Sequence, residues 1–186
     1  ASYRDSFLRT AGVALATARA GNVLGGGDWS AERLLPDIFR AWQGGEEVVL
    51  RYPGATRPWQ HVLDPLMGYL QLAQSLLTEG DRHAGAWNFG PDSAGLASVG
   101  DIVSRLARHW PGEARWSVAA DAQPHEAGLL ALDSSKARQL LGWAPRWSLD
   151  HTLKQTLAWH LAWRAGRDMN IVTREQIAAH QGETHE

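Results

Sequence analysis

The chain alternates short apolar runs with longer segments of helical periodicity, and this alternation constrains its fold more than any other feature. The expected strands are residues 13–18, 46–50, 58–62 and 86–89, with weaker candidates at 115–118 and 128–132. The expected helices are residues 1–11, 31–43, 64–78, 98–110, 134–141, 148–165 and 173–180. Strands that alternate with helices indicate the α/β class. We therefore expect a small sheet that helices cover well.

Several helix ends carry local signals. Ser98 is followed three residues later by Asp101, which is typical of a capping box. Ser148 begins a longer helix, and Gly142 follows the last residue of a shorter one. Residues 1–11 have no N-cap ahead of them. We therefore expect them to be the end of a helix that leads into a short buried strand.

Composition and charge exclude several classes of protein. The 186 residues suit one domain, or one domain with a small appendage. A net charge of −2 gives no long-range attraction for nucleic acid or an anionic membrane. The absence of cysteine excludes disulfides and thiolate metal sites. No apolar run approaches the roughly 20 residues that a membrane helix needs. We expect a cytoplasmic protein without nucleic-acid or membrane partners.

Three consecutive glycines, Gly25–Gly27, follow the first strand. The spacing of a dinucleotide or nucleoside-triphosphate loop is absent, so we expect a turn that relieves backbone crowding. Asn22 follows the same strand, at the edge of the sheet where α/β proteins bind ligands. Asparagine also forms turns readily, and the sequence leaves both interpretations open.

Three polar residues in other turns are candidates for anion binding. Arg33 follows the glycine run, and Arg57 follows a turn that contains Pro53 and Gly54. Two arginines could hold a diphosphate through charge-assisted hydrogen bonds, although without further context a pair of solvated arginines explains the pattern better. Asn88 could donate to a phosphate or simply begin the turn before Gly90.

The sequence does not support metal or nucleophilic chemistry. The eight histidines lack the spacing of a metal site, since His151 and His160 lie nine residues apart on one expected helix. No Gly-x-Ser-x-Gly motif is present. We therefore expect no metal and no catalytic residue. The ten tryptophans are expected to serve mainly in packing.

Taken in order, the motifs resemble the C-terminal half of the extended short-chain dehydrogenase/reductases that act on nucleotide sugars. The matching segments are RAGNVLGGGDW (19–29), RLLPD (33–37), RPWQHV (57–62), WNFGP (87–91), PHEA (124–127) and LLGWAPRW (140–147). The forms that these motifs take at residues 25–29 and 57–61 resemble those of the enzymes in this family that act on CDP-sugars. The resemblance implies the last part of a Rossmann-like parallel sheet plus a small mixed α/β substrate-binding domain.

The resemblance also implies a set of substrate-binding residues. Asn22 would contact the diphosphate, Arg57 would clamp it, and Asn88 would support it. His125 would close the far side of the site.

The nucleotide would lie against four further residues by the same resemblance. Arg33 and Leu34 would run along it, and Val49 and Leu50 would line the base pocket through backbone and apolar contacts.

The chain departs from the family in lacking its reaction centre. None of the three tyrosines has a lysine four residues later, and no cofactor glycine motif is present. Without that tyrosine there is no base to assist oxidation of the sugar at C4. The resemblance implies a longer NAD-dependent enzyme that converts CDP-glucose to CDP-4-dehydro-6-deoxyglucose. We expect this chain alone to be inactive.

The resemblance further implies a domain division and a partner. Residues 1–30 would be the C-terminal remnant of the NAD-binding Rossmann domain, and residues 31–186 the nucleotide-sugar-binding domain. Segments at about 57–90 would return to the Rossmann sheet. The complete enzyme is expected to be a homo-oligomer. The sequence is also compatible with another epimerase or dehydratase of this fold, with a non-catalytic nucleotide-sugar-binding module and with a structural remnant.

Overall fold

The structure is a computed structural model that describes residues 3–8, 10–120 and 128–182. Its strands form three small groups. β1 (Ala16–Ala20) pairs in parallel with β5 (Gly85–Phe89). β2 (Asn22–Leu24) pairs in parallel with β4 (Thr56–His61), which also pairs antiparallel with β6 (Leu96–Ser98). β3 (Val48–Leu50) pairs in parallel with β7 (Trp116–Val118).

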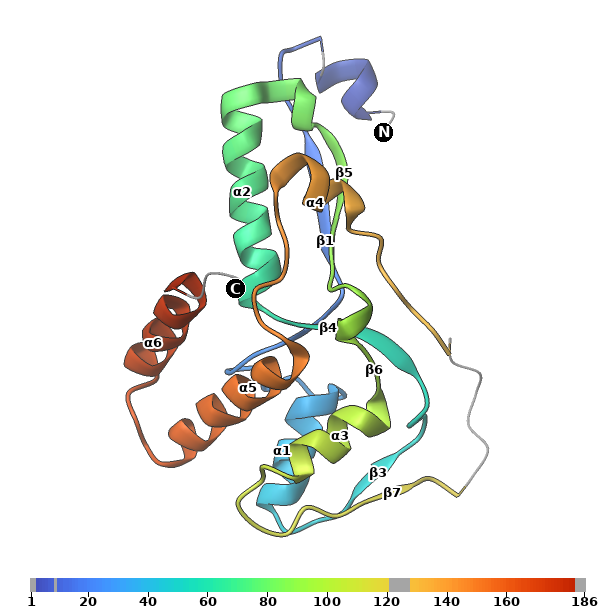
Figure 1. The fold of residues 1–186 in the computed structure, drawn as a ribbon, viewed down its shortest axis with the longest axis vertical. Helices are drawn as coiled ribbons and strands as arrows, with labels where there is room; N and C mark the ends of the chain where they lie inside the picture. Colours follow the sequence, from blue (N-terminus) through green and yellow to red (C-terminus); the bar gives the residue numbers. More distant parts are fainter. Residues whose placement is uncertain (1–2, 9, 121–127, 183–186) are drawn as a thin grey trace.

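Helices surround these strands. The longer ones are α1 (Leu34–Gln43), α2 (Leu63–Glu79), α3 (Val99–Ala107), α4 (Ser135–Leu141), α5 (Leu149–Arg164) and α6 (Met169–Gly182). Shorter turns are the π-helix η1 (Arg4–Leu8) and the 3-10 helices η2 (Gly80–His83) and η3 (Ser93–Gly95). In Figure 1, β1 and β5 lie beside α2 and α4 in the upper part, and α1, α3, β3 and β7 fill the lower part. The expected α/β class is confirmed.

Each of the two parts contains an apolar core. The smaller lies between α2, α4 and β5 and consists of Leu72, Trp87, Phe89, Ala137 and Trp143. The larger joins α1, α3, α5 and the strands between them, and it contains Trp42, Trp59 and Trp110. Most of the tryptophans are therefore packing residues, as the sequence predicts. Trp29 and Trp163 are the most exposed, at 46% and 41%.

The predicted caps are confirmed. Ser98 Oγ accepts from the Asp101 N–H at 3.1 Å, and the Asp101 carboxylate accepts from the Ser98 N–H at 3.2 Å. Ser148 Oγ accepts from the His151 N–H at 3.2 Å at the start of α5. Gly142 ends α4 with a left-handed φ of 63°, where glycine has no Cβ to clash.

Some predicted boundaries are wrong. α1 begins at Leu34 rather than at residue 31, because Glu32 has a φ of 62° and Arg33 is extended. α6 begins four residues early, at Met169, because the Asp168 carboxylate caps its first turn. Residues 128–132 form a single bridge, between Leu129 and Thr56, instead of a strand.

The N-terminal predictions also need correction. The helix expected over residues 1–11 is the short π-helix η1 within the described residues. The sequence predicts a buried first strand, yet the three central residues of β1 are exposed. The cause is its position, since β1 pairs only with β5 in the described part of the chain.

Gly21 lets the chain change partners between two adjacent strands. β1 ends at Ala20 beside β5, and β2 begins at Asn22 beside β4. A Cβ on Gly21 would lie 2.7 Å from the carbonyl oxygen of Pro58, so only glycine fits this crossing. β5 thus lies beside β1, and the expected domain division stays a prediction. No helix in the described ranges is both long and apolar enough to span a membrane.

Candidate functional site

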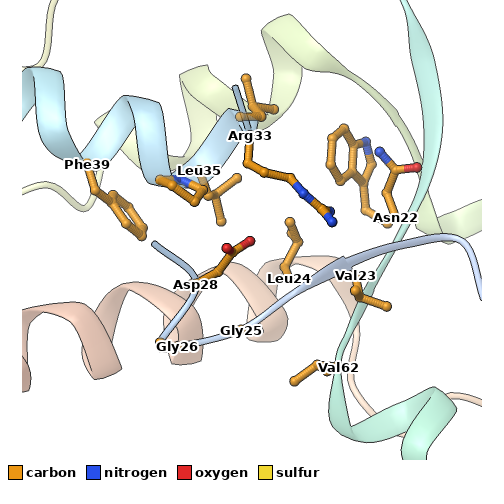
Figure 2. A pocket seen from close by; sticks show the side chains of 14 residues that line it. Asn22, Val23, Leu24, Gly25, Gly26, Asp28, Arg33, Leu35, Phe39 and Val62 are labelled. Carbon is orange, nitrogen blue, oxygen red and sulfur yellow. The ribbon is translucent and has the colours of Figure 1, made fainter. Parts of the chain in front are cut away.

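A pocket of about 380 Å³ lies at the carboxyl end of β2, between the glycine run and the start of α1. Its volume falls within the range of about 300–1,000 Å³ that small-molecule sites occupy. In Figure 2 the strand and the turn form one wall, and α1 forms the other. Its lining residues are Asn22, Val23, Leu24, Gly25, Gly26, Gly27, Asp28, Arg33, Leu34, Leu35, Pro36, Phe39, Trp59 and Val62.

The floor of the pocket is fixed by paired strands. Asn22 lies opposite Trp59 in the β2–β4 register. The buried Trp59 indole donates to the carbonyl oxygen of Ala97 on β6 at 2.9 Å, which fixes the orientation of its ring. The half-buried Asn22 side chain therefore stands over a rigid surface, where its amide can donate to a ligand oxygen.

Arg33 and Leu34 enter the pocket from the start of α1. Arg33 is extended and exposed, and its carbonyl oxygen accepts from the Asp37 N–H at 3.0 Å. Figure 2 shows its side chain pointing into the pocket on the side of Asn22. Leu34 is partly buried against the larger core. A guanidinium, an amide and an apolar side chain from three of the predicted residues thus face one cavity, and their role in binding a substrate stays a prediction.

Asp28 brings a negative charge to the same pocket. Partial burial raises the pKa of its carboxyl group, but the Ser30 N–H at 3.0 Å and the Arg33 and Arg40 charges outweigh that effect and lower it. The group is therefore ionised at neutral pH. The pocket is lined by one cation and one anion among the described residues, and it suits a ligand with both phosphate oxygens and hydrogen-bond donors.

The turn that carries Asp28 is held from outside the pocket. The Arg40 guanidinium donates to the carbonyl oxygens of Trp29 and Ser30 at 3.1 and 3.3 Å, and it pairs with Asp37. The backbone geometry of the pocket rim therefore depends on α1 as well as on its own residues.

The glycine run is a packing device, as the sequence predicts. A Cβ on Gly26 would lie 2.0 Å from the Trp159 ring, and Gly27 has a φ of 81°. A Cβ on Gly25 would lie 2.7 Å from the Val62 side chain. Glycine is required here because the chain passes close to α5 and to the residue that follows β4.

Val49 and Leu50 do not line this pocket. They are neighbours on β3, so their side chains point to opposite faces. Leu50 is buried in the larger core, whereas Val49 is 58% exposed. Their predicted contact with a base stays a prediction.

Arg57 and Asn88 also lie outside the lining of the pocket. Arg57 is half-buried near the start of β4, two residues before Trp59 and on the same face of the strand. Its guanidinium donates to the carbonyl oxygen of Thr56 at 3.0 Å. Asn88 lies opposite Arg19 and donates to the carbonyl oxygen of Asp133 at 2.9 Å.

The roles predicted for Arg57 and Asn88 therefore stay predictions. So does the role of His125, which lies outside the described residues.

Sequence reasoning missed a buried polar cluster at the start of α2. His61 is 1% exposed, and its burial lowers its pKa to about 4, although Asp64 opposes the shift. Asp64 Oδ1 accepts from the Arg146 N–H at 2.7 Å and lies 2.9 Å from His180 Nε2. These residues are far apart in the sequence, and no local pattern signals their contact. No group able to hold a metal ion occurs within residues 3–8, 10–120 and 128–182.

The comparisons with solved structures define the class of fold. The chain superimposes on UDP-glucose-4-epimerase from Stenotrophomonas maltophila, a structure with bound NAD and formylated UDP-arabinopyranose. The TM-score is 0.74 at 19% identity, with 89% of this chain and 53% of the other covered. For dTDP-glucose 4,6-dehydratase from Bacillus anthracis, in complex with NAD, the TM-score is 0.61 at 16% identity, with coverage of 86% and 47%. The chain has the Rossmann-like fold of the nucleotide-sugar epimerases and dehydratases.

The sequence comparison is more specific. The chain is 45% identical over 188 aligned positions to CDP-glucose 4,6-dehydratase of Salmonella typhimurium. The alignment covers 98% of this chain and 52% of that protein, so the chain spans about half the length of this curated relative. No family model matches the chain. The resemblance predicted from the motifs is confirmed.

Proposed function

We propose that this chain is the substrate-binding part of a NAD-dependent CDP-glucose 4,6-dehydratase. One observation carries the proposal: Asn22, Arg33 and Leu34, which the sequence motifs predict as substrate-binding residues, face a single pocket. The 45% identity to a protein with that activity supports the choice of reaction. The nucleotide sugar would lie between the glycine run and α1.

The chemistry of the pocket suits a pyrophosphate ligand. The Arg33 guanidinium would donate to phosphate oxygens, and hydrogen bonds of this charge-assisted kind contribute about 1.5–3 kcal/mol. The neutral Asn22 amide would donate without a counter-charge. Leu34, Phe39 and Val62 would exclude water from one side of the ligand. The protein would thus bind and orient the sugar for chemistry at C4.

The glycine run and the start of α1 do not fit the pyrophosphate of NAD. The glycine run is backed by Trp159, and the next helix does not begin until Leu34. The first turn of that helix contains Pro36, which lacks an N–H, and Asp37, which would repel a phosphate. NAD supplies hydride transfer in enzymes of this class, and this glycine turn would not hold its pyrophosphate. We therefore propose that the chain alone lacks turnover.

Titration of the full-length protein with CDP-glucose tests the proposal. Arg33→Ala is expected to weaken binding about tenfold or more, because the lost interaction contributes about 1.5–3 kcal/mol. Arg82→Ala is the matched control, since Arg82 is highly exposed, pairs with Glu79 and lies outside the pocket lining. Equal affinities of the two variants would contradict the proposed site. Competition with UDP-, dTDP- and GDP-glucose distinguishes a related epimerase or dehydratase from the proposed enzyme.

A non-catalytic module and a structural remnant predict different results. A non-catalytic module would bind the nucleotide sugar without any turnover by the full-length protein. If the chain is a structural remnant, Arg57→Ala is expected to leave any nucleotide affinity unchanged. Homo-oligomerisation and a cytoplasmic location complete the proposal, and size-exclusion chromatography with light scattering checks the first.

A further inference from the structure

The glycine run at the rim of the pocket cannot hold its own shape. Gly25, Gly26 and Gly27 have no side chains to restrict them, and glycine loses more conformational freedom on ordering than any other residue. All three line the pocket. A rim of this kind has to be ordered by whatever packs against its outer side.

Trp159 of α5 is the side chain that packs there. Its ring occupies the space that a Cβ on Gly26 would need, and it lies 3.4 Å from the position of a Cβ on Gly27. The indole is 9% exposed. Its ring centroid also lies 6.2 Å from that of Trp29, at the other end of the turn. One buried ring therefore contacts both the glycines and the residue after Asp28.

The position of Trp159 is fixed by α6. The indole N–H donates to Thr173 Oγ1 at 3.0 Å. Gln176, one turn further along α6, donates to the carbonyl oxygen of Gln155 on α5 at 2.8 Å. A cavity of about 60 Å³ remains between Gly26, Trp159 and α6. Figure 1 shows α6 beside α5, on the outside of the molecule.

We propose that Trp159 and Thr173 are positioning residues for the glycine run, so that α6 sets the affinity of the pocket for its nucleotide sugar. The inference rests on the proposed function and concerns the same pocket. A rim that is ordered before the ligand arrives spares the cost of ordering it on binding. Loss of the Trp159–Thr173 hydrogen bond would give the ring more freedom to move and so would loosen the glycines that pack on it, although Arg40 still holds the far end of the turn.

The test measures substrate affinity and stability together in the full-length protein. Thr173→Val keeps the shape of the side chain but removes the acceptor, and Trp159→Phe removes the donor. Each is expected to raise Kd and KM for CDP-glucose about three- to tenfold, the range expected for one hydrogen bond. KM is expected to change more than kcat. Trp159→Phe and Thr173→Val together should cost little more than either alone.

Two matched controls separate positioning from stability. Thr78→Val makes the same chemical change on the exposed face of α2, where the hydroxyl bonds only within its helix. Trp87→Phe removes another buried indole, which lies outside the pocket lining and whose N–H donates to the carbonyl oxygen of His83 at 2.8 Å. The Trp87 variant is expected to lower Tm without raising KM.

A second variant pair tests the contact itself. Gly26→Ala places a methyl group in the Trp159 ring and is expected to raise KM, whereas the same change in a Trp159→Leu protein should raise it less. If Thr173→Val and Trp159→Phe lower Tm but leave KM unchanged, or if the two Gly26→Ala effects are equal, the inference is wrong. In that case wild-type affinity for CDP-glucose still supports the proposed function. Absence of wild-type affinity refutes the function instead.

Discussion

Asp64 joins three parts of the chain, and its removal is the most informative test of the fold. Its side chain is completely buried at the start of α2. Oδ1 accepts from the Arg146 N–H at 2.7 Å and lies 2.9 Å from His180 Nε2 on α6. The Asp64 carbonyl oxygen accepts from the Trp143 indole at 2.9 Å. The residue thus connects α2, the segment after α4 and the end of α6.

Asp64→Ala removes the carboxylate and leaves both of its partners unsatisfied. Each donor that is left without an acceptor costs about 1–3 kcal/mol, so the two together cost about 2–6 kcal/mol. For a domain of this size about 1 kcal/mol corresponds to roughly 2–4 °C in Tm. We therefore expect Tm to fall by roughly 4–24 °C. Asp64→Asn keeps an acceptor for the Arg146 N–H and should lose less.

Thermal unfolding measures the global effect, and amide hydrogen exchange of α6 measures the local one. Asp150→Ala is the control, because Asp150 forms an exposed ion pair with Arg105 at 2.7 Å. An exposed pair contributes about 1 kcal/mol or less. If Asp64→Ala is no more destabilising than Asp150→Ala, or if α6 amides stay as protected as in the wild type, the reasoning about this buried link is refuted.

Two further predictions concern stability. Burial lowers the pKa of His61 to about 4, so the unfolded chain, with a histidine pKa of about 6.5, binds the proton more readily. The stability that neutral His61 contributes is present above about pH 6.5 and is lost as the pH falls through 4. The free energy of urea unfolding of His61→Gln should therefore depend less on pH than that of the wild type. Equal pH dependence of the two free energies would contradict this. Gly68→Ala would place a methyl group 2.3 Å from the Phe89 ring, so we expect a loss of about 1–3 kcal/mol despite the better helix propensity of alanine. Gly54→Ala is the control, because a Cβ on Gly54 would have no atom within 4 Å. Equal denaturant midpoints of the Gly68→Ala and Gly54→Ala proteins would contradict the close packing of α2 on β5.

The sequence predicts those features that depend on neighbouring residues. The capping box of Ser98 and Asp101, the Ser148 cap and the Gly142 stop are local, and each is confirmed. Asn22 and Arg33 can be proposed as pocket residues because each lies at the end of an element. The sequence places the start of α1 too early because Glu32 adopts a left-handed conformation that non-glycine residues rarely take.

The remaining features depend on contacts between distant segments. Nothing near Gly26 in the sequence indicates that Trp159 fills the space behind it. The Asp64–His180 contact links residues 116 positions apart, and neither residue has a distinctive neighbourhood. Asp28 belongs to a recognised motif, yet its ionised state depends on Ser30 and on nearby arginines in the folded turn. Such contacts follow from the three-dimensional packing, which periodicity alone does not encode.

The crossing at Gly21 connects the two strand groups directly. The five residues before Gly21 pair with β5, and the three residues after it pair with β4. Any rotation of one pair against the other would be transmitted to Asn22 through a single residue, Gly21, which has no room for a side chain beside Pro58. Whatever binds to or displaces the β1–β5 pair would therefore act directly on the amide that faces the pocket.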